Sequence, residues 1–347
     1  MIKEKQIFEQ SASSRLNDFL EIRRGGDFGE VKPITPDAST REYFRIKWER
    51  STAIACVYQE SFLPETQPYI DVTNLFAASG LPVAEILDSD GERGVIIHQD
   101  FGDKILRDVV ETVSDDESEV LLHQTITLIA EVQKATLKAF ELGSIASRLA
   151  FDFEKLSWEL DFFTKHYFES LRGENLSESD SHNLKKELDE VATELAARPR
   201  ILTHRDFHAA NLMLDQTGRI CIIDQQDARM GTSSYDLVSL LLDRVEEPPP
   251  TSWIREKRLF FLEERRKLGL PPIDPDEFAH EFRLQTIQRC LKAIGTFSFQ
   301  TAVRGKTQYA QYINPMFEIV LHATEWLNRF PHLQTIIKKQ LTSIEPN

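Results

Sequence analysis

The first hundred residues alternate between short β-prone runs and one helical stretch. The runs EYFRIKWE (42–49) and STAIACVYQE (51–60) predict two strands joined by a short polar turn. Residues 64–80 have apolar positions at helical spacing and end at a glycine, so we expect a helix there. Residues 81–101 predict two more strands around the turn DSDGERG.

After Gly102 the hydrophobic spacing becomes helical. Helices are expected over 116–141, 152–171, 178–197, 252–267, 276–303 and 309–328. One interruption occurs, where ANLMLD and RICIID alternate as strands around the turn QTG. The length of 347 residues exceeds what one core usually supports. We therefore expect an α+β chain with a small mixed β N-lobe (1–101) and a larger helical C-lobe (102–347).

Composition places the chain among ordinary globular proteins, with 41% hydrophobic and 28% charged residues. The three cysteines, Cys56, Cys221 and Cys290, are far apart and lack CxxC spacing, which predicts neither a disulfide framework nor a zinc site. The N-terminus has charges throughout and no apolar core of a signal peptide, and no apolar run is long enough to span a membrane. We expect a cytoplasmic protein without a membrane partner.

The formal net charge of −15 argues against a nucleic-acid partner, because binding to that backbone depends on clustered Lys and Arg. The acidic excess is typical of a solvated surface, or of a protein that attracts a cationic substrate. No segment indicates an obligate protein partner.

Residues 203–228 carry the candidate chemistry. His204, Asp206 and Asn211 have the spacing HxDxxxxN, and Asp224 ends the strand RICIID. Phosphoryl transfer needs such groups, because its barrier is lowered mainly by positioning and by charge neutralisation with Mg²⁺. Asp206 could accept the proton of an acceptor hydroxyl or orient that hydroxyl, while Asn211 and Asp224 could bind Mg²⁺. A hairpin would bring these two ligands together despite their separation in sequence.

The segments HRDFHAANLML, ICIIDQQDA and GTSSYDLVSLLLD resemble the catalytic loop, metal-binding loop and following helix of the aminoglycoside phosphotransferase superfamily, which includes choline kinases and is related to protein kinases. The similarity extends to DASTREYFRI (37–46) and to residues 288–313, and so covers nearly the whole chain. This wider pattern resembles the bacterial anomeric kinases that phosphorylate N-acetylmuramate and N-acetylglucosamine at C1 in cell-wall (peptidoglycan) recycling. The resemblance implies a bilobal kinase-like fold, ATP as phosphoryl donor and Mg²⁺.

The resemblance also implies roles for the residues of the catalytic segment. Asp206 would be the catalytic base, and Asn211 and Asp224 the metal ligands. Asp236 would brace the catalytic loop by accepting hydrogen bonds from backbone amides, or would simply cap the following helix.

Three further residues of this segment are structural or substrate candidates. His204 is expected to order the loop, and His208 either fills the core or lines the acceptor site. Asp227 stands three residues after Asp224 in the predicted metal-binding loop.

The N-lobe would bind the nucleotide. The hydroxyls of Ser39 and Thr40 would hold phosphate oxygens, and the backbone of the hinge near Gln99 to Phe101 would bind adenine. The strand 51–60 lacks the usual phosphate-clamping lysine, and no GxGxxG precedes it. Either Arg41 or Arg45 could supply that charge, or both are surface arginines. A further departure is Gln225, which stands where an aromatic residue is usual.

Three functional hypotheses follow. The first is an ATP-dependent sugar 1-kinase, and the second a phosphotransferase for a cationic acceptor such as an aminoglycoside or choline. The third is a catalytically silent kinase-like binding module, against which the complete set of Asp206, Asn211 and Asp224 argues. Lys292, Arg304 and Lys306 favour the sugar, unless they belong to a solvated basic helix end. The sequence leaves open the preference between ATP and GTP and the oligomeric state.

Overall fold

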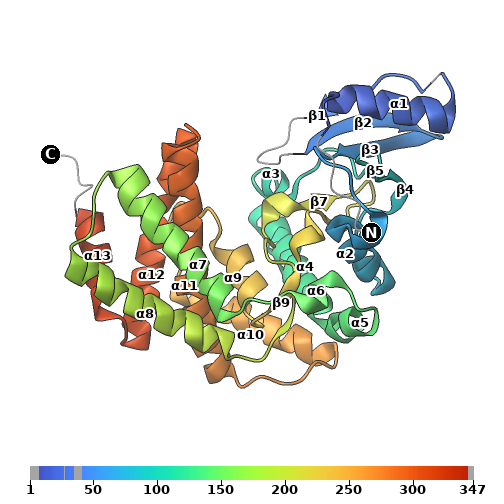
Figure 1. The fold of residues 1–347 in the computed structure, drawn as a ribbon. Helices are drawn as coiled ribbons and strands as arrows, with labels where there is room; N and C mark the ends of the chain where they lie inside the picture. Colours follow the sequence, from blue (N-terminus) through green and yellow to red (C-terminus); the bar gives the residue numbers. More distant parts are fainter. Residues whose placement is uncertain (1–7, 27, 35–40, 343–347) are drawn as a thin grey trace. The chain divides into compact units, whose positions relative to one another are not determined.

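The computed structural model describes residues 8–26, 28–34 and 41–342 (Figure 1). The chain forms two compact units: the first comprises Met1–Ser114 and Ala209–Asp227, and the second comprises Asp115–His208 and Ala228–Asn347. The division between the units therefore does not coincide with the expected lobe boundary after Phe101. Residues 102–114 and 209–227, expected in the C-lobe, belong to the first unit.

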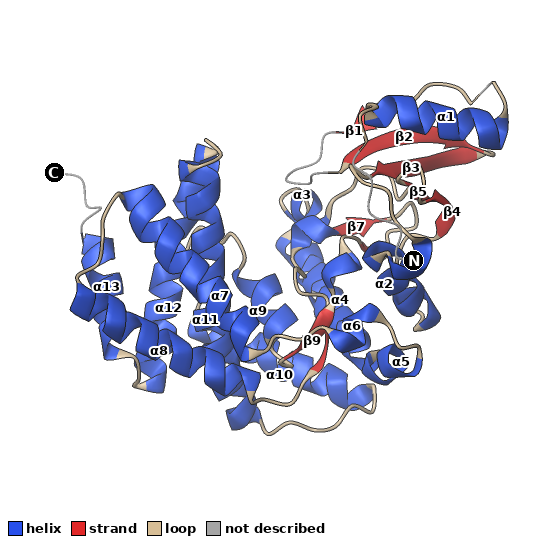
Figure 2. Ribbon diagram, viewed as in Figure 1, coloured by secondary structure: helices blue, strands red, loops and turns tan. Residues whose placement is uncertain are grey.

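The first unit is built on a five-stranded antiparallel sheet with the order β1-β2-β3-β5-β4 (Figure 2). Its strands are β1 (Lys32–Ile34), β2 (Glu42–Trp48), β3 (Ser51–Val57), β4 (Ile86–Asp90) and β5 (Val95–Gln99). The four predicted strands are confirmed, although β3 ends three residues earlier than expected. The sheet fits the α+β class that the hydrophobic pattern predicts.

Period-two alternation gives the sheet two different faces. On one face, Phe44, Ile46, Ala53, Ala55, Val57, Val95 and Ile97 pack with the apolar side of helix α1 (Ala12–Arg24). On the other face, Tyr69 of helix α2 (Pro68–Ala78) lies 5.7 Å from the ring of His98, centroid to centroid. Gly80 follows α2 with φ +76°, a left-handed conformation suited to the glycine that was expected to end this helix.

The predicted hairpin is present as β7 (Leu212–Leu214) and β8 (Ile220–Ile222). Its turn is held by the carboxylate of Asp215, which accepts hydrogen bonds from the backbone N–H groups of Thr217 (2.8 Å) and Arg219 (3.0 Å). Backbone bonds attach the hairpin to the rest of the first unit: Ile222 N–H donates to Pro82 O, and Leu214 N–H donates to Lys104 O. The short helix α3 (Leu106–Val110) follows this contact.

The second unit is mainly helical. Its helices are α4 (Asp115–Lys134), α5 (Thr136–Glu141), α6 (Ile145–Arg148), α7 (Phe153–Thr164), α8 (Glu178–Ala196), α9 (Tyr235–Leu242), α10 (Thr251–Lys267), α11 (Pro275–Ala302), α12 (Ile313–Leu327) and α13 (Pro331–Thr342). The helices predicted after Gly102 are present, with three refinements. The first is divided at Ala135 into α4 and α5, α7 continues as a π-helix (Lys165–Arg172), and α12 is preceded by a 3₁₀ segment (Thr307–Tyr312). None of the helices in the described ranges is both long and apolar enough to cross a membrane.

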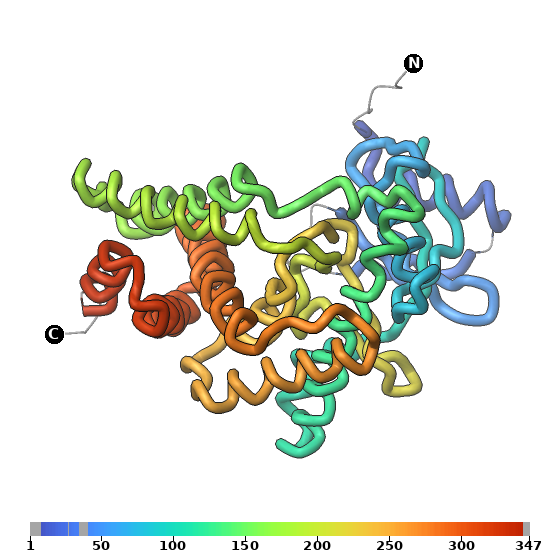
Figure 3. The backbone as a smooth tube through the Cα atoms, turned by 90° about the horizontal axis from the view of Figure 1, so that it is seen from below, coloured from blue at the N-terminus to red at the C-terminus, as the bar shows by residue number. Residues whose placement is uncertain are grey.

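Helix α11 is the central element of the second unit, and it packs against α7, α8, α9 and α12 (Figure 3). Where it crosses α7, Gly295 allows close approach: a Cβ atom at this position would lie 2.7 Å from Cα and 2.9 Å from N of Phe163. Beside this crossing, Phe163 stacks edge-on against Phe168 and Phe317. The glycine is therefore required by packing, in the middle of a helix where alanine would otherwise be preferred.

We predict that Gly295→Ala lowers the free energy of unfolding by about 1–3 kcal/mol, because overpacking at the backbone of α7 outweighs the better helix propensity of alanine. Denaturant unfolding of the whole chain measures this change. Gly26→Ala serves as the control, since a Cβ atom there meets nothing within 4 Å. An unchanged or increased stability of Gly295→Ala would contradict the close-approach argument.

Candidate active site

The loop that carries Asp206 lies in the second unit, directly after strand β6 (Ile201–Thr203). This strand pairs with β9 (Arg229–Gly231), and the fully buried carboxylate of Asp236 then fixes the loop. Asp236 accepts hydrogen bonds from the backbone N–H groups of His204 (2.7 Å) and Arg205 (3.0 Å). Asp236 is in the first turn of α9, whose N-cap is Ser234. Burial raises the pKa of Asp236 to about 6, and these two amides act in the opposite direction.

Arg205 has an unusual backbone conformation, with φ +86°. Such a left-handed conformation is costly for a residue with a side chain, on the order of 1–3 kcal/mol. The hydrogen bond from its N–H to Asp236 helps to hold it. The loop is therefore fixed at the bend and at the residue before it, and Asp206 follows immediately.

The carboxylate of Asp206 lies between cationic groups. Its Oδ1 atom is 3.1 Å from Nζ of Lys292 and 3.4 Å from a terminal guanidinium nitrogen of Arg289, both on α11. Its Oδ2 atom is 3.7 Å from Nε of Arg205. Although burial acts to raise it, the pKa of Asp206 is held well below its usual range by the charges of Lys292, Arg289 and Arg205. Asp206 is thus an anion at neutral pH.

The two histidines of the loop have different surroundings. His204 is buried and packs edge-on against Phe207, with the ring centroids 5.6 Å apart. His208 is partly exposed, and its backbone N–H donates to the carbonyl of Asp206 at 3.1 Å. Burial lowers the pKa of His208, while Asp243 acts to raise it.

Asn211 and Asp224 lie at the open end of the hairpin in the first unit, where the N–H of Ile223 donates to the carbonyl of Asn211 at 3.1 Å. Asp224 has φ +64°, and its Oδ1 accepts hydrogen bonds from Arg41 (3.1 Å) and Gln226 (2.8 Å). Its side chain is 40% exposed. An amide and a carboxylate are the oxygen donors that Mg²⁺ prefers, so the residues present fit this metal.

Gln225, next to Asp224, points into the first unit and is buried. Its Nε2 donates to Oγ1 of Thr73 on α2 at 2.6 Å, and the threonine is also buried. Gln225, which stands where an aromatic residue is usual, therefore makes a buried hydrogen bond in place of an aromatic contact. This bond ties the loop after β8 to α2.

The two candidate arginines of the N-lobe differ in their partners. Arg45 bonds Asp100 through both Nε (2.7 Å) and a terminal nitrogen (3.2 Å), and it also pairs with Asp103 at 2.7 Å. Arg41 instead bonds Asp224, and its guanidinium lies 5.7 Å from the ring centroid of Tyr43. Arg45 therefore braces residues 100–103, whereas Arg41 lies beside a candidate metal ligand.

The remaining nucleotide candidates are placed as follows. Gln99 is exposed at the end of β5, and its N–H donates to Glu85 O at 2.9 Å. Phe101 packs in a small apolar cluster with Ala84 and Cys221, so its side chain is buried. Asp227 ends the 3₁₀ turn after Asp224. Ser39 and Thr40 lie outside the described residues.

Sequence reasoning missed the contact between α11 and Asp206. For Lys292 the interpretation as part of a solvated helix end is wrong, since its side chain is only 17% exposed and bonds Asp206. Arg289 was not considered at all. Their spacing of three residues on a predicted helix was the available signal, because such residues share one face.

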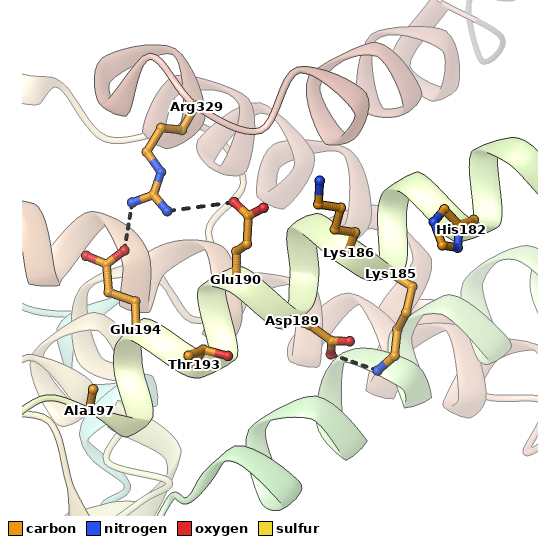
Figure 4. A pocket seen from close by; sticks show the side chains of 9 residues that line it. All are labelled: His182, Lys185, Lys186, Asp189, Glu190, Thr193, Glu194, Ala197 and Arg329. Atoms are coloured by element: carbon orange, nitrogen blue, oxygen red, sulfur yellow. Dashed lines mark hydrogen bonds and ion pairs between the residues drawn. The ribbon is translucent and has the colours of Figure 1, made fainter.

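Two other groups of polar side chains in the second unit are already satisfied. A hollow along α8 is lined by charged residues, and its Arg329 pairs with Glu190 and Glu194, 3.9 and 2.7 Å away (Figure 4). Elsewhere, Glu119, His123 and Glu256 lie close enough to hold a metal ion, but Nζ of Lys257 bonds all three. Neither group contains a predicted site residue.

Comparison with known proteins identifies relatives over most of the chain. The sequence model described as "phosphotransferase enzyme family" matches residues 30–270. An N-acetylmuramate/N-acetylglucosamine kinase of Neisseria meningitidis is 30% identical over 275 residues, 79% of each chain. One of Pseudomonas aeruginosa with the same name is 30% identical over 284 residues, 81% of this chain and 79% of its own.

Solved structures share the fold. The gentamicin complex of APH(2")-IIa aligns with a TM-score of 0.61 at 12% identity, covering 94% of this chain and 99% of the other. Choline kinase from Cryptosporidium parvum aligns with a TM-score of 0.60 at 12% identity, covering 91% and 96%. These similarities confirm the bilobal kinase-like class predicted from the sequence.

We predict that Thr73→Val lowers the free energy of unfolding by about 1–3 kcal/mol, because the buried amide of Gln225 loses its acceptor without a change of shape. Thermal unfolding measures the loss, and Thr73→Ser, which keeps the hydroxyl, is the control. The double variant Thr73→Val/Gln225→Leu should recover part of the stability, since both polar partners are removed together. A Thr73→Val protein as stable as the parent would refute the anchor.

Proposed function

Because the chain belongs to the phosphotransferase enzyme family, we propose that it transfers the γ-phosphoryl group of ATP to the C1 hydroxyl of an N-acetylated amino sugar. The acceptor would be N-acetylmuramate or N-acetylglucosamine, and the product a sugar 1-phosphate for use in cell-wall recycling. The observation that carries this choice is the shared name of the two relatives that are 30% identical over about four-fifths of this chain.

In this reaction, the ionised carboxylate of Asp206 would act on the acceptor hydroxyl. A bond forms between the acceptor oxygen and the γ-phosphorus, and the bond from phosphorus to the bridging oxygen breaks, so that its electron pair leaves with ADP. The hydroxyl proton passes to Asp206 and then to solvent. Asp206 orients the hydroxyl and receives its proton, in a loop whose conformation is held by Asp236.

The nucleotide and metal would be bound largely by the first unit. Asn211 and Asp224 would hold Mg²⁺, which neutralises phosphate charge when it is bound. The backbone near Gln99 to Phe101 would bind adenine, with Ser39 and Thr40 on the phosphates. The acceptor would be bound by the second unit.

A cationic acceptor is the second candidate, since solved relatives in fold include aminoglycoside phosphotransferases and choline kinase. The electrostatics around Asp206 disfavour it. Lys292 and Arg289 place two positive charges next to the carboxylate that would receive the acceptor hydroxyl. A polycation there would meet like charges in a poorly solvated site, whereas a neutral or carboxylate-bearing sugar would not.

Radiolabelled ATP and a panel of acceptors test the proposal. We expect label in N-acetylmuramate and N-acetylglucosamine, and none in their methyl glycosides, in which C1 is blocked. Asp206→Asn should lower kcat by about 100-fold or more while leaving nucleotide affinity intact. Label in an aminoglycoside or choline alone would select the second candidate, and label in no acceptor would favour a silent module.

We also predict that Arg41→Met raises the KM for ATP by roughly tenfold, the loss expected when a charge-assisted hydrogen bond of about 1.5 kcal/mol is removed. The reason is that Arg41 takes the place of the missing lysine beside the phosphates. Steady-state kinetics at saturating acceptor measure this change. Arg45→Met is the comparison, expected to lower the melting temperature and leave the KM for ATP unchanged. The reverse result would assign the phosphate charge to Arg45.

A further inference from the structure

Two cations on one face of α11, far from the catalytic loop in sequence, converge on one oxygen of Asp206. Lys292 and Arg289 are three residues apart, and both lie within 3.4 Å of Oδ1. Neither is a surface charge, because their side chains are 17% and 7% exposed. A buried charge is costly unless it is paired, so this arrangement has to be supported by its surroundings.

Buried hydrogen bonds to neighbouring elements fix the orientation of α11 about its own axis. Three hydrogen bonds of 2.8 Å run along it between buried groups: Thr232 Oγ1 donates to Gln285, Gln285 Nε2 donates to Gln288, and Gln288 Nε2 donates to Glu159 on α7. Arg289 has a second anchor, since it donates to the hydroxyl of Ser239 on α9 at 3.0 Å. The two cations are therefore presented to Asp206 by a fixed helix face.

We propose that Lys292 and Arg289 are positioning residues for phosphoryl transfer: they hold the Asp206 carboxylate as an anion in one orientation, with Oδ1 tied to α11. This inference rests on the proposed function, since it assigns Asp206 to the acceptor hydroxyl. Lys292 makes the shorter contact with Oδ1, 3.1 Å against 3.4 Å for Arg289, so most of the effect is assigned to it.

This arrangement determines what kind of base Asp206 is. A carboxylate whose charge is stabilised by two cations binds a proton weakly. Its main role is therefore to orient the acceptor hydroxyl. A weak base suits a loose transition state, in which the proton is lost late. It also suits an acidic acceptor: the hydroxyl at C1 of a reducing sugar ionises more readily than an ordinary alcohol, because the ring oxygen withdraws electron density.

Other charged and titratable groups also act on this carboxylate or on the two cations. They are Arg205 and His208 on its own loop, Tyr235 and Asp236 on α9, Asp243 just after α9, and Glu159 on α7. After a change at position 292, Arg289 and Arg205 still lie beside Asp206, so its charge stays partly stabilised. Removal of Lys292 alone should therefore raise the pKa of Asp206 without neutralising the site.

The test is the pH dependence of kcat for Lys292→Met in the full chain, measured with saturating ATP, Mg²⁺ and the sugar that the parent accepts. For the parent, the rate should not fall on the acid side above about pH 5, because Asp206 stays ionised. For Lys292→Met, we expect the acid limb to move upward by about 1–3 pH units, the shift that a neighbouring charge produces. Lys292→Arg should restore the parental profile.

Controls separate this role from a structural one and from failure of the proposed function. Lys186→Met, which removes an exposed lysine of α8, should keep the parental profile. Lys292→Gln, which keeps a hydrogen-bond donor and loses the charge, should reproduce the shift if the Met variant does not fold. An unchanged acid limb in an active, folded Lys292 variant overturns the inference. A parent inactive on every sugar overturns the proposed function instead.

Discussion

The hydrogen bonds from the His204 and Arg205 amides to the buried carboxylate of Asp236 are the constraint on which the candidate site depends. Without them, Arg205 would have little reason to keep its left-handed backbone conformation. The bend at Arg205 determines where the next residue, Asp206, is placed. Burial opposes the charge of Asp236, and the two amides offset part of that cost. The same two hydrogen bonds therefore stabilise both the buried carboxylate and the strained backbone of Arg205.

Much of the fold follows from local patterns in the sequence. The strands of the first unit, the helix ending near Gly80 and the hairpin that follows Asn211 all have a period or a turn residue that marks them. The sequence pattern did not predict α1 and α13, and helix divisions such as that at Ala135 depend on packing rather than on periodicity. The unit boundary also differs from a simple division after Phe101, because backbone bonds join the hairpin to Pro82 and Lys104.

The candidate site was predictable to a smaller extent. Spacing predicts Asp206, Asn211 and Asp224 as candidates, because the HxDxxxxN pattern and the hairpin that leads to Asp224 lie within one short segment. Spacing does not identify contacts between residues that are far apart in the sequence. Lys292 is 86 positions from Asp206, and Thr73 is 152 positions from Gln225. Such contacts depend on tertiary packing, which residue spacing along the chain does not encode.

The charges near Asp206 also show why net charge is a poor guide to the acceptor. The chain carries −15 overall, which taken alone would favour a cationic substrate. Most of those charges are solvated, where salt screens them within about 10 Å. The buried contacts of Lys292 and Arg289 act at 3.1 and 3.4 Å, where screening is weak. In the proposed reaction, this local pair would therefore favour a neutral or anionic sugar as the acceptor at Asp206.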